Sequence, residues 1–193
     1  EPAMASNIKI EILSGIILLA GLFWISRYNN LLFHSLAELF SIAVAWSVFL
    51  VVWNVQRHIR TDGLFILGTG FLFIGLIDLL HMLAYKGMGV FPESIDADLA
   101  TQLWIAARYV EALCILTFVL YARRRVSPVP VTLLFSVIAL FCLSAVFMKI
   151  FPVCYIEGHG FTLFKKASEY IIRAVLFINE SPPEGWTCSQ HDP

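Results

Sequence analysis

Long uninterrupted runs of apolar residues dominate the pattern of this sequence. A transmembrane helix needs roughly 20 mostly apolar residues, because a helix rises about 1.5 Å per residue and the hydrocarbon core of a bilayer is about 30 Å thick. Five runs meet this requirement and predict five transmembrane helices. They cover residues 10–26, 31–55, 64–85, 99–121 and 131–151.

A sixth apolar run is shorter than a full span. It begins near Phe164 and ends at Ile178, which corresponds to about 15 residues or roughly 22 Å of helix. The chain then turns polar, and residues 179–193 are expected to form an irregular tail. We therefore expect an all-α fold: a polytopic transmembrane helix bundle of five spans and a truncated sixth, with residues 1–178 forming one membrane-embedded domain.

The composition supports this architecture and excludes two classes of protein. Of the 193 residues, 59% are hydrophobic and 14% are charged, and the mean hydropathy is +0.80. Soluble domains usually carry about 25% charged residues, so a soluble fold could not bury this many apolar side chains. The net charge of -1 argues against nucleic acid as a partner, because nucleic-acid-binding proteins present a basic surface.

Short polar segments connect the apolar runs, and such connections predict antiparallel neighbouring helices. The first run follows Lys9 as a signal peptide would, but no small-residue cleavage site comes after it, so we expect a retained helix. Orientation is predicted from the basic residues of the loops, which favour the cytoplasmic side. Through the fifth run one side holds Lys9, Arg57, Arg60, Arg123, Arg124 and Arg125, and the other holds Arg27 and Lys86. The N-terminus is therefore expected in the cytoplasm, although Lys149, Lys165 and Lys166 on the other side weaken this count.

Ionisable residues lie inside the predicted helices. Each costs about 2.5–3.5 kcal/mol at the centre of a membrane helix, so each is a functional candidate. Alternation of the helices brings the starts of the second, fourth and sixth runs and the end of the third to one side of the membrane. The ionisable residues are therefore expected in one leaflet, the outer one under the predicted orientation. They are His34, Glu38, Asp78, His81, Arg108, Glu111, Glu169 and Arg173.

These residues form pairs with helical spacing, and each pair has two interpretations. His34 and Glu38 are four residues apart and share a helix face, and the pairs Asp78–His81 and Arg108–Glu111 are three apart. In the structural interpretation, Arg108 and Glu111 neutralise one another, and the histidine–acid pairs hold helices together by hydrogen bonds.

In the functional interpretation, the same pairs bind a metal, a cofactor or a small ligand. The imidazoles and carboxylates of His34, Glu38, Asp78 and His81 suit zinc, manganese or iron, and helix bundles do build metal sites in their cores. Haem with His34 and His81 as axial ligands is another option. A third option is a pocket for a small polar or anionic ligand, with Arg108 and Lys165 as charge partners.

The segment between the third and fourth runs could cover such a pocket or serve as a plain connector. Gly87 and Gly89 permit tight turns, and Asp98 can cap the fourth helix. Trp104, Tyr109 and Tyr85 are interpreted as part of an interfacial aromatic belt. No nucleophile elbow, phosphate-binding loop or metalloprotease motif is present in the sequence, and we do not expect an enzyme.

Four separated segments together resemble a known family. They read FHSLAELFSI, GLIDLLHMLAYKGMGVFP, LATQLWIAARYVEAL and IFPVCYIEGHGFTLFKKASEY. In this order they are similar to the membrane-associated sensor (MASE) domain of the third type, a bacterial integral membrane module, and the resemblance covers about residues 31–172. The matching positions form the expected ligand-binding set. They are His34, Glu38, Asp78, His81, Lys86, Gln102, Arg108, Glu111, Lys165 and Glu169.

The resemblance implies a sensory input domain in the bacterial inner membrane. Such domains precede PAS domains, histidine kinases of two-component systems, or GGDEF and EAL domains that handle cyclic di-GMP. The expected partners are the lipid bilayer, a cytoplasmic kinase or cyclase output domain, and a second copy in a homodimer. The family's last helix continues as an apolar span, whereas this sequence turns polar after Ile178. A fragment, a truncated product and a stand-alone input module are the alternatives.

Two other function classes fit the same residues. A small transporter or membrane enzyme would use the histidines and acids as proton relays or in chemistry. The paired halves and broken helices typical of transporters are not evident in the sequence. A purely structural module would use the pairs only to fix helix packing.

Overall fold

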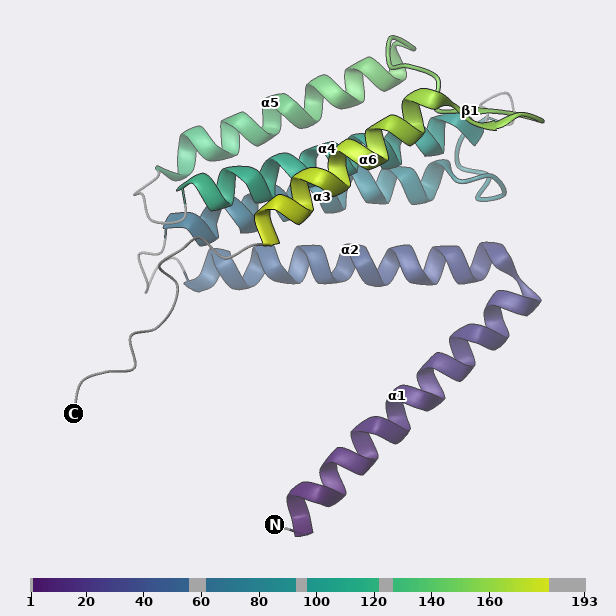
Figure 1. Cartoon of the computed structure of the whole chain (residues 1–193), viewed down its shortest axis with the longest axis vertical. Helices are drawn as coiled ribbons and strands as arrows, with labels where there is room; N and C mark the ends of the chain where they lie inside the picture. The colour runs from purple at the N-terminus through teal and green to yellow at the C-terminus, as the bar shows by residue number, and fades with distance from the viewer. Residues whose placement is uncertain (1, 56–61, 93–96, 122–126, 181–193) are drawn as a thin grey trace.

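The computed structural model describes residues 2–55, 62–92, 97–121 and 127–180 (Figure 1). Over these residues the chain forms six helices and one small hairpin. The helices are α1 (Pro2–Tyr28), α2 (Asn30–Val55), α3 (Asp62–Ala84), α4 (Ala97–Tyr121), α5 (Pro128–Phe147) and α6 (Leu163–Glu180). The hairpin pairs β1 (Tyr155–Ile156) with β2 (Gly160–Phe161) in antiparallel fashion. The all-α expectation is confirmed.

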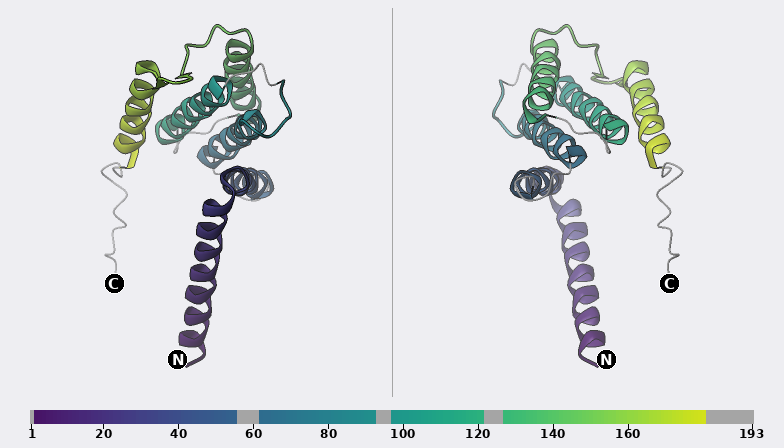
Figure 2. Two further views of the ribbon diagram at one scale, coloured as in Figure 1. Left: turned by 90° about the vertical axis from the view of Figure 1, so that its right-hand side faces the viewer. Right: turned by 90° about the vertical axis from the view of Figure 1, so that its left-hand side faces the viewer.

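Helix α3 lies at the centre of the bundle, between α2 and α4. Seen along the bundle, α2, α3, α4 and α5 follow one another, and α6 lies beside α4 (Figure 2). The core is formed mainly by α3, α4 and α5, where Ile77, Leu103, Val110 and Phe135 are completely buried. This side of the bundle is closed by packing.

Small residues on α3 allow its neighbours to come close. A Cβ atom added to Gly70 would overlap the Sγ atom of Cys114 on α4, and one added to Gly75 would lie 2.6 Å from the Trp46 indole nitrogen on α2. Lipid tails are as apolar as leucine, so membrane helices associate through this close packing rather than through a hydrophobic driving force. The glycines of α3 therefore fix it against two neighbours at once.

Five of the helices are long and apolar enough to cross a membrane, namely α1 to α5. Their outward faces carry large exposed apolar side chains, such as Phe40 on α2 and Phe141 on α5, each 73% exposed. Exposing such large apolar surfaces to water is unfavourable, whereas contact with lipid tails is not. The prediction of five spans is confirmed, and α6, with 18 residues, is not among them.

Helix α1 departs from the predicted antiparallel arrangement. It extends obliquely away from the bundle on the side of α2 (Figures 1 and 2). Only Asn29 separates the two helices, and its N–H still donates to the Ile25 carbonyl while its own carbonyl accepts from Phe33. A reversal between antiparallel helices needs about 2–5 residues, so this connection bends the chain instead of turning it back.

Helix α5 ends at Phe147, before the predicted end at residue 151. The N–H of Ile150 donates to the Ala145 carbonyl, that of Lys149 donates to Val146, and Lys149 has φ 58°. These bonds form a Schellman motif, which usually has glycine at the position that Lys149 occupies. The sequence did not predict this helix end, because the apolar run continues past it and no glycine marks it.

Candidate ligand-binding site

The polar residues of the bundle gather at one of its ends. The start of α2, the end of α3, the start of α4 and the start of α6 meet there, beside the β1–β2 hairpin (Figure 1). This agrees with the arrangement predicted from helix alternation. The ten predicted site residues fall into four groups, each with different partners.

The first group surrounds a cavity of about 270 Å³. It opens where α2, α3, α4 and α6 approach one another, and five of the ten predicted residues line it. These five residues belong to α2, α3 and α6, and the other lining residues belong to α4 and the hairpin. The lining residues are His34, Glu38, His81, Thr101, Trp104, Phe161, Lys165 and Glu169.

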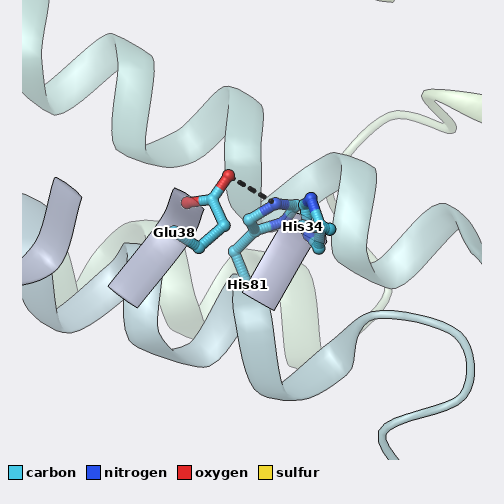
Figure 3. A group of neighbouring side chains, drawn as sticks. All are labelled: His34, Glu38 and His81. Carbon is cyan, nitrogen blue, oxygen red and sulfur yellow. Dashed lines mark ion pairs between the residues drawn. The ribbon is translucent and has the colours of Figure 1, made fainter. Parts of the chain in front are cut away.

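His81, near the end of α3, is oriented by a backbone carbonyl. Its Nδ1 atom lies 2.7 Å from the carbonyl oxygen of Ala100 on α4, and its residue is 6% exposed. A carbonyl oxygen can only accept, so Nδ1 carries the proton. The Nε2 atom is therefore the one that faces Glu38, at 3.7 Å from its Oε1 atom (Figure 3).

His34 completes this cluster from the first turns of α2. Its ring stacks on Tyr85 with centroids 3.9 Å apart and meets the His81 ring edge-on at 5.5 Å. Its Nε2 atom is buried, and the described residues offer it no hydrogen-bond partner. Such an atom is costly to bury, and this makes it a candidate for ligand contact.

Glu38 lies one helical turn beyond His34 on the same face of α2. Ligand atoms of His34, Glu38 and His81 all lie within 4.8 Å of one another. Figure 3 shows the three side chains converging from α2 and α3. Within the described part of the chain, the ion pair of Glu38 is the one with His81, so no permanent cation lies within ion-pair distance of this carboxylate, although the charge of Arg108 reaches it from farther away.

The α6 wall of the cavity carries a buried lysine. The ammonium of Lys165 lies 2.8 Å from Glu169 on the next turn. It also lies 3.8 Å from the Phe161 ring centroid and 5.2 Å from that of Trp104, so cation–π attraction adds to the ion pair. The Tyr109 hydroxyl shares a hydrogen bond with Ser168 and ties α6 to α4 beside this wall.

The second group is an ion-paired triad deeper in the bundle. The Arg108 guanidinium donates to Asp78 at 2.6 Å and to Glu111 at 2.7 Å. Asp78 therefore does not join the cluster of His34, Glu38 and His81, although the sequence suggested it as a fourth metal ligand. The predicted Arg108–Glu111 pair is present, and one arginine serves two carboxylates.

The third group holds the hairpin and the start of α6 in place. Asp98 of α4 accepts hydrogen bonds from the N–H groups of Cys154 and Tyr155 and from the Gln102 amide. Burial, together with the Asp98 charge, raises the pKa of the Cys154 thiol to about 12. Gln102 thus supports the segment between α5 and the hairpin, because its side-chain amide also donates to the carbonyls of Phe151 and Pro152.

The fourth group is Lys86, which lies at the rim of a different cavity. Its ammonium pairs with Glu157 of the hairpin at 3.0 Å, and both side chains are mostly exposed. This second cavity has a volume of about 500 Å³ and is also lined by Gly87 and Gly89. Both glycines have positive φ, which confirms that the loop turns tightly there.

Four residues near the histidines were not predicted from the sequence. Tyr85 stacks on His34, and Thr101, Trp104 and Phe161 line the cavity. The sequence alone favours an interfacial role for Trp104 and Tyr85. Thr101, Trp104 and Arg108 do recur with helical spacing on α4, which was the available signal. Nothing in the sequence placed Phe161, because its position depends on the hairpin.

Fold and site together define a polytopic membrane module with an open pocket, lined in part by ionisable side chains, between its helices. The MASE3 family, described as a membrane-associated sensor domain, matches residues 25–180, which is more than half of the chain. The chain therefore belongs to this membrane-associated sensor domain family, and most of α1 precedes the matched region. No curated protein and no solved structure gives a match.

Proposed function

We propose that this chain is the sensory input domain of a bacterial signal-transduction protein, and that the cavity is where its signal binds. The observation that carries the proposal is the cavity's position. Its lining comes from α2 and α3 on one side and from α6 on the other. A ligand that contacts both sides would change how α6 packs against the bundle.

The helix contacts support this route. Helix α6 packs chiefly on α4, through buried Ile172 and the Tyr109–Ser168 hydrogen bond. Its contacts with α2 and α3 are sparse, so the cavity occupant would supply much of the interaction between them. A ligand shifts such an equilibrium only through different affinities for the two arrangements, and bridging contacts would provide that difference.

The output is proposed to lie in the cytoplasm, beyond α6, as a kinase, PAS or GGDEF/EAL domain. The basic residues that predict a cytoplasmic N-terminus support this topology in the inner membrane. Several of them, Arg57, Arg60 and Arg123–125, lie outside the described residues, as does the tail from residue 181. The cavity would then face the outer leaflet.

A full-length protein that joins this chain to a GGDEF output domain would test the proposal. Glu38→Ala and His81→Ala should each change the cellular level of cyclic di-GMP several-fold, because they alter the cavity. Glu157→Ala and His159→Ala make the same chemical changes on the exposed hairpin and should leave the level unchanged. Unaltered output from both cavity variants would refute the assignment of the sensing site.

A further inference from the structure

We infer that His34, Glu38 and His81 bind a divalent transition-metal ion of the Zn²⁺ or Fe²⁺ class. This inference rests on the proposed function, since it names the occupant of the same cavity. Two imidazole nitrogens and one carboxylate oxygen are a donor set used by both zinc and non-haem iron sites. Three protein ligands leave at least one coordination position open toward the cavity that they line.

The distances suit an ion with only small adjustments. Ligand atoms on a tetrahedron with bonds of about 2.1 Å lie about 3.4 Å apart. The Nε2 atom of His81 and the Oε1 atom of Glu38 are 3.7 Å apart, and all three ligand atoms lie within 4.8 Å of one another. Each pair is therefore within about 1.4 Å of the tetrahedral separation.

The surroundings of His81 match those of a metal-binding histidine. Such histidines almost always donate their second ring N–H to a carboxylate, a carbonyl or water, which fixes the tautomer and the ring orientation. The Ala100 carbonyl, 2.7 Å from Nδ1, has this role here. It leaves the lone pair of Nε2 directed at the centre of the cluster.

The charges around the cavity also call for a cation. Glu38 and Glu169 bring two negative charges to the lining and Lys165 brings one positive charge, and Lys165 is already paired with Glu169. The charge of Arg108 on α4 also reaches Glu38, but this guanidinium is ion-paired with both Asp78 and Glu111. A metal ion would neutralise Glu38 and would also satisfy the buried Nε2 atom of His34.

The same geometry disfavours haem. A haem with two axial histidines needs a flat macrocycle between the two imidazoles. The His34 and His81 rings stand edge-to-face with centroids 5.5 Å apart, and the Glu38 carboxylate shares their meeting point. A single ion fits there, and a macrocycle does not.

The test uses the purified full chain in lipid nanodiscs, stripped with a chelator and then titrated with Zn²⁺ alone. We expect one zinc per chain by elemental analysis. His34→Ala, His81→Ala and the isosteric Glu38→Gln should each weaken Zn²⁺ binding on the order of 100-fold, since loss of supporting residues alone costs about 10–100-fold. His159→Ala and Glu157→Gln on the exposed hairpin should leave the affinity unchanged.

Co²⁺ in place of zinc gives a second readout that does not require a variant. Visible d–d absorption bands should show nitrogen and oxygen ligation in the unmodified chain. Less than a tenth of an equivalent of zinc, or zinc binding that survives all three cavity substitutions, would overturn the inference. If zinc does not bind but Glu38→Ala still changes cyclic di-GMP output, the metal assignment fails and the sensing function stands. If zinc binds at these residues but its removal leaves output unchanged, the sensing function fails instead.

Discussion

The triad of Asp78, Arg108 and Glu111 and the cluster of His34, Glu38 and His81 lie in the same bundle and have opposite character. In the triad every charge has an opposite charge within 2.7 Å. In the cluster a carboxylate faces an imidazole at 3.7 Å, and a second imidazole has a buried nitrogen without a partner among the described residues. Both groups are polar residues in membrane helices, so polarity alone does not distinguish structure from function. The difference lies in whether the protein itself supplies the opposite charge, because the buried Oδ1 of Asp78 and Nε of Arg108 also lack hydrogen-bond partners among the described residues.

The surroundings of the two groups differ in the same way. The triad bridges α3 and α4, the two helices that pack most extensively. The cluster borders a cavity of about 270 Å³. We call the region around Asp78, Arg108 and Glu111, where α3 packs on α4, the closed side of the bundle. We call the region around His34, Glu38 and His81, which borders the cavity and can accept a ligand, the open side. Changes on the closed side should reduce stability, and changes on the open side should reduce binding.

The largest effect is expected from Arg108→Met. It leaves the buried Asp78 and the partly buried Glu111 without their cation, and breaking a buried ion pair in this way costs about 3–5 kcal/mol. The melting temperature of the purified protein should fall sharply. Replacing all three residues together with apolar ones of similar size should recover much of this loss. A melting temperature unchanged by Arg108→Met would remove the structural role that we give to the triad.

Gly70→Ala tests the packing of the closed side. The new methyl group would overlap the Cys114 sulfur, and overpacking of this kind costs about 1–3 kcal/mol. The double variant Gly70→Ala/Cys114→Ala should regain most of the lost stability. Gly15→Ala on α1 is the matched control, because a Cβ atom there meets nothing within 4 Å. Equal losses from both glycine variants in thermal unfolding would argue against this packing.

Asp98→Ala should have a smaller effect on stability, about 1–2 kcal/mol, because two backbone N–H groups lose their acceptor. It should also change the reactivity of Cys154. Burial and the Asp98 charge raise the pKa of this thiol to about 12, so in the native protein it stays protonated and should react slowly with maleimide at pH 8. The variant should label faster.

The pKa of the Cys154 thiol also makes stability depend on pH. Because this pKa is higher in the folded protein than in the unfolded chain, the thiol's contribution to stability is complete below about pH 9 and is lost as the pH rises toward 12.

Glu38→Gln is expected to change stability least, by less than about 1 kcal/mol, because it removes a charge that has no permanent cation within ion-pair distance among the described residues. Thermal unfolding of the metal-free protein would measure this. Glu111→Gln, which removes a charge paired with Arg108 at 2.7 Å, is the matched comparison on the closed side and should cost more. The reverse order would break the contrast between the two sides.

The sequence predicted the fold well because membrane spans depend on length and apolarity, which are local properties. It also placed the polar residues at one end of the bundle, since alternation of helices requires it. It overran the end of α5 because Lys149 stands where glycine usually marks a helix end. It could not separate Asp78 from the cluster, because that depends on which helix faces Arg108. Phe161 was missed because the hairpin that positions it has only two residues in each strand.

A zinc-edge anomalous difference map from crystals of the full chain tests the central claim most directly. The account predicts one strong peak among His34, Glu38 and His81, within about 2.0–2.2 Å of one nitrogen from each histidine and one oxygen of the carboxylate. A peak at Asp78 and Glu111 instead, or a map without a peak and with a direct hydrogen bond between Glu38 and His81, would contradict it.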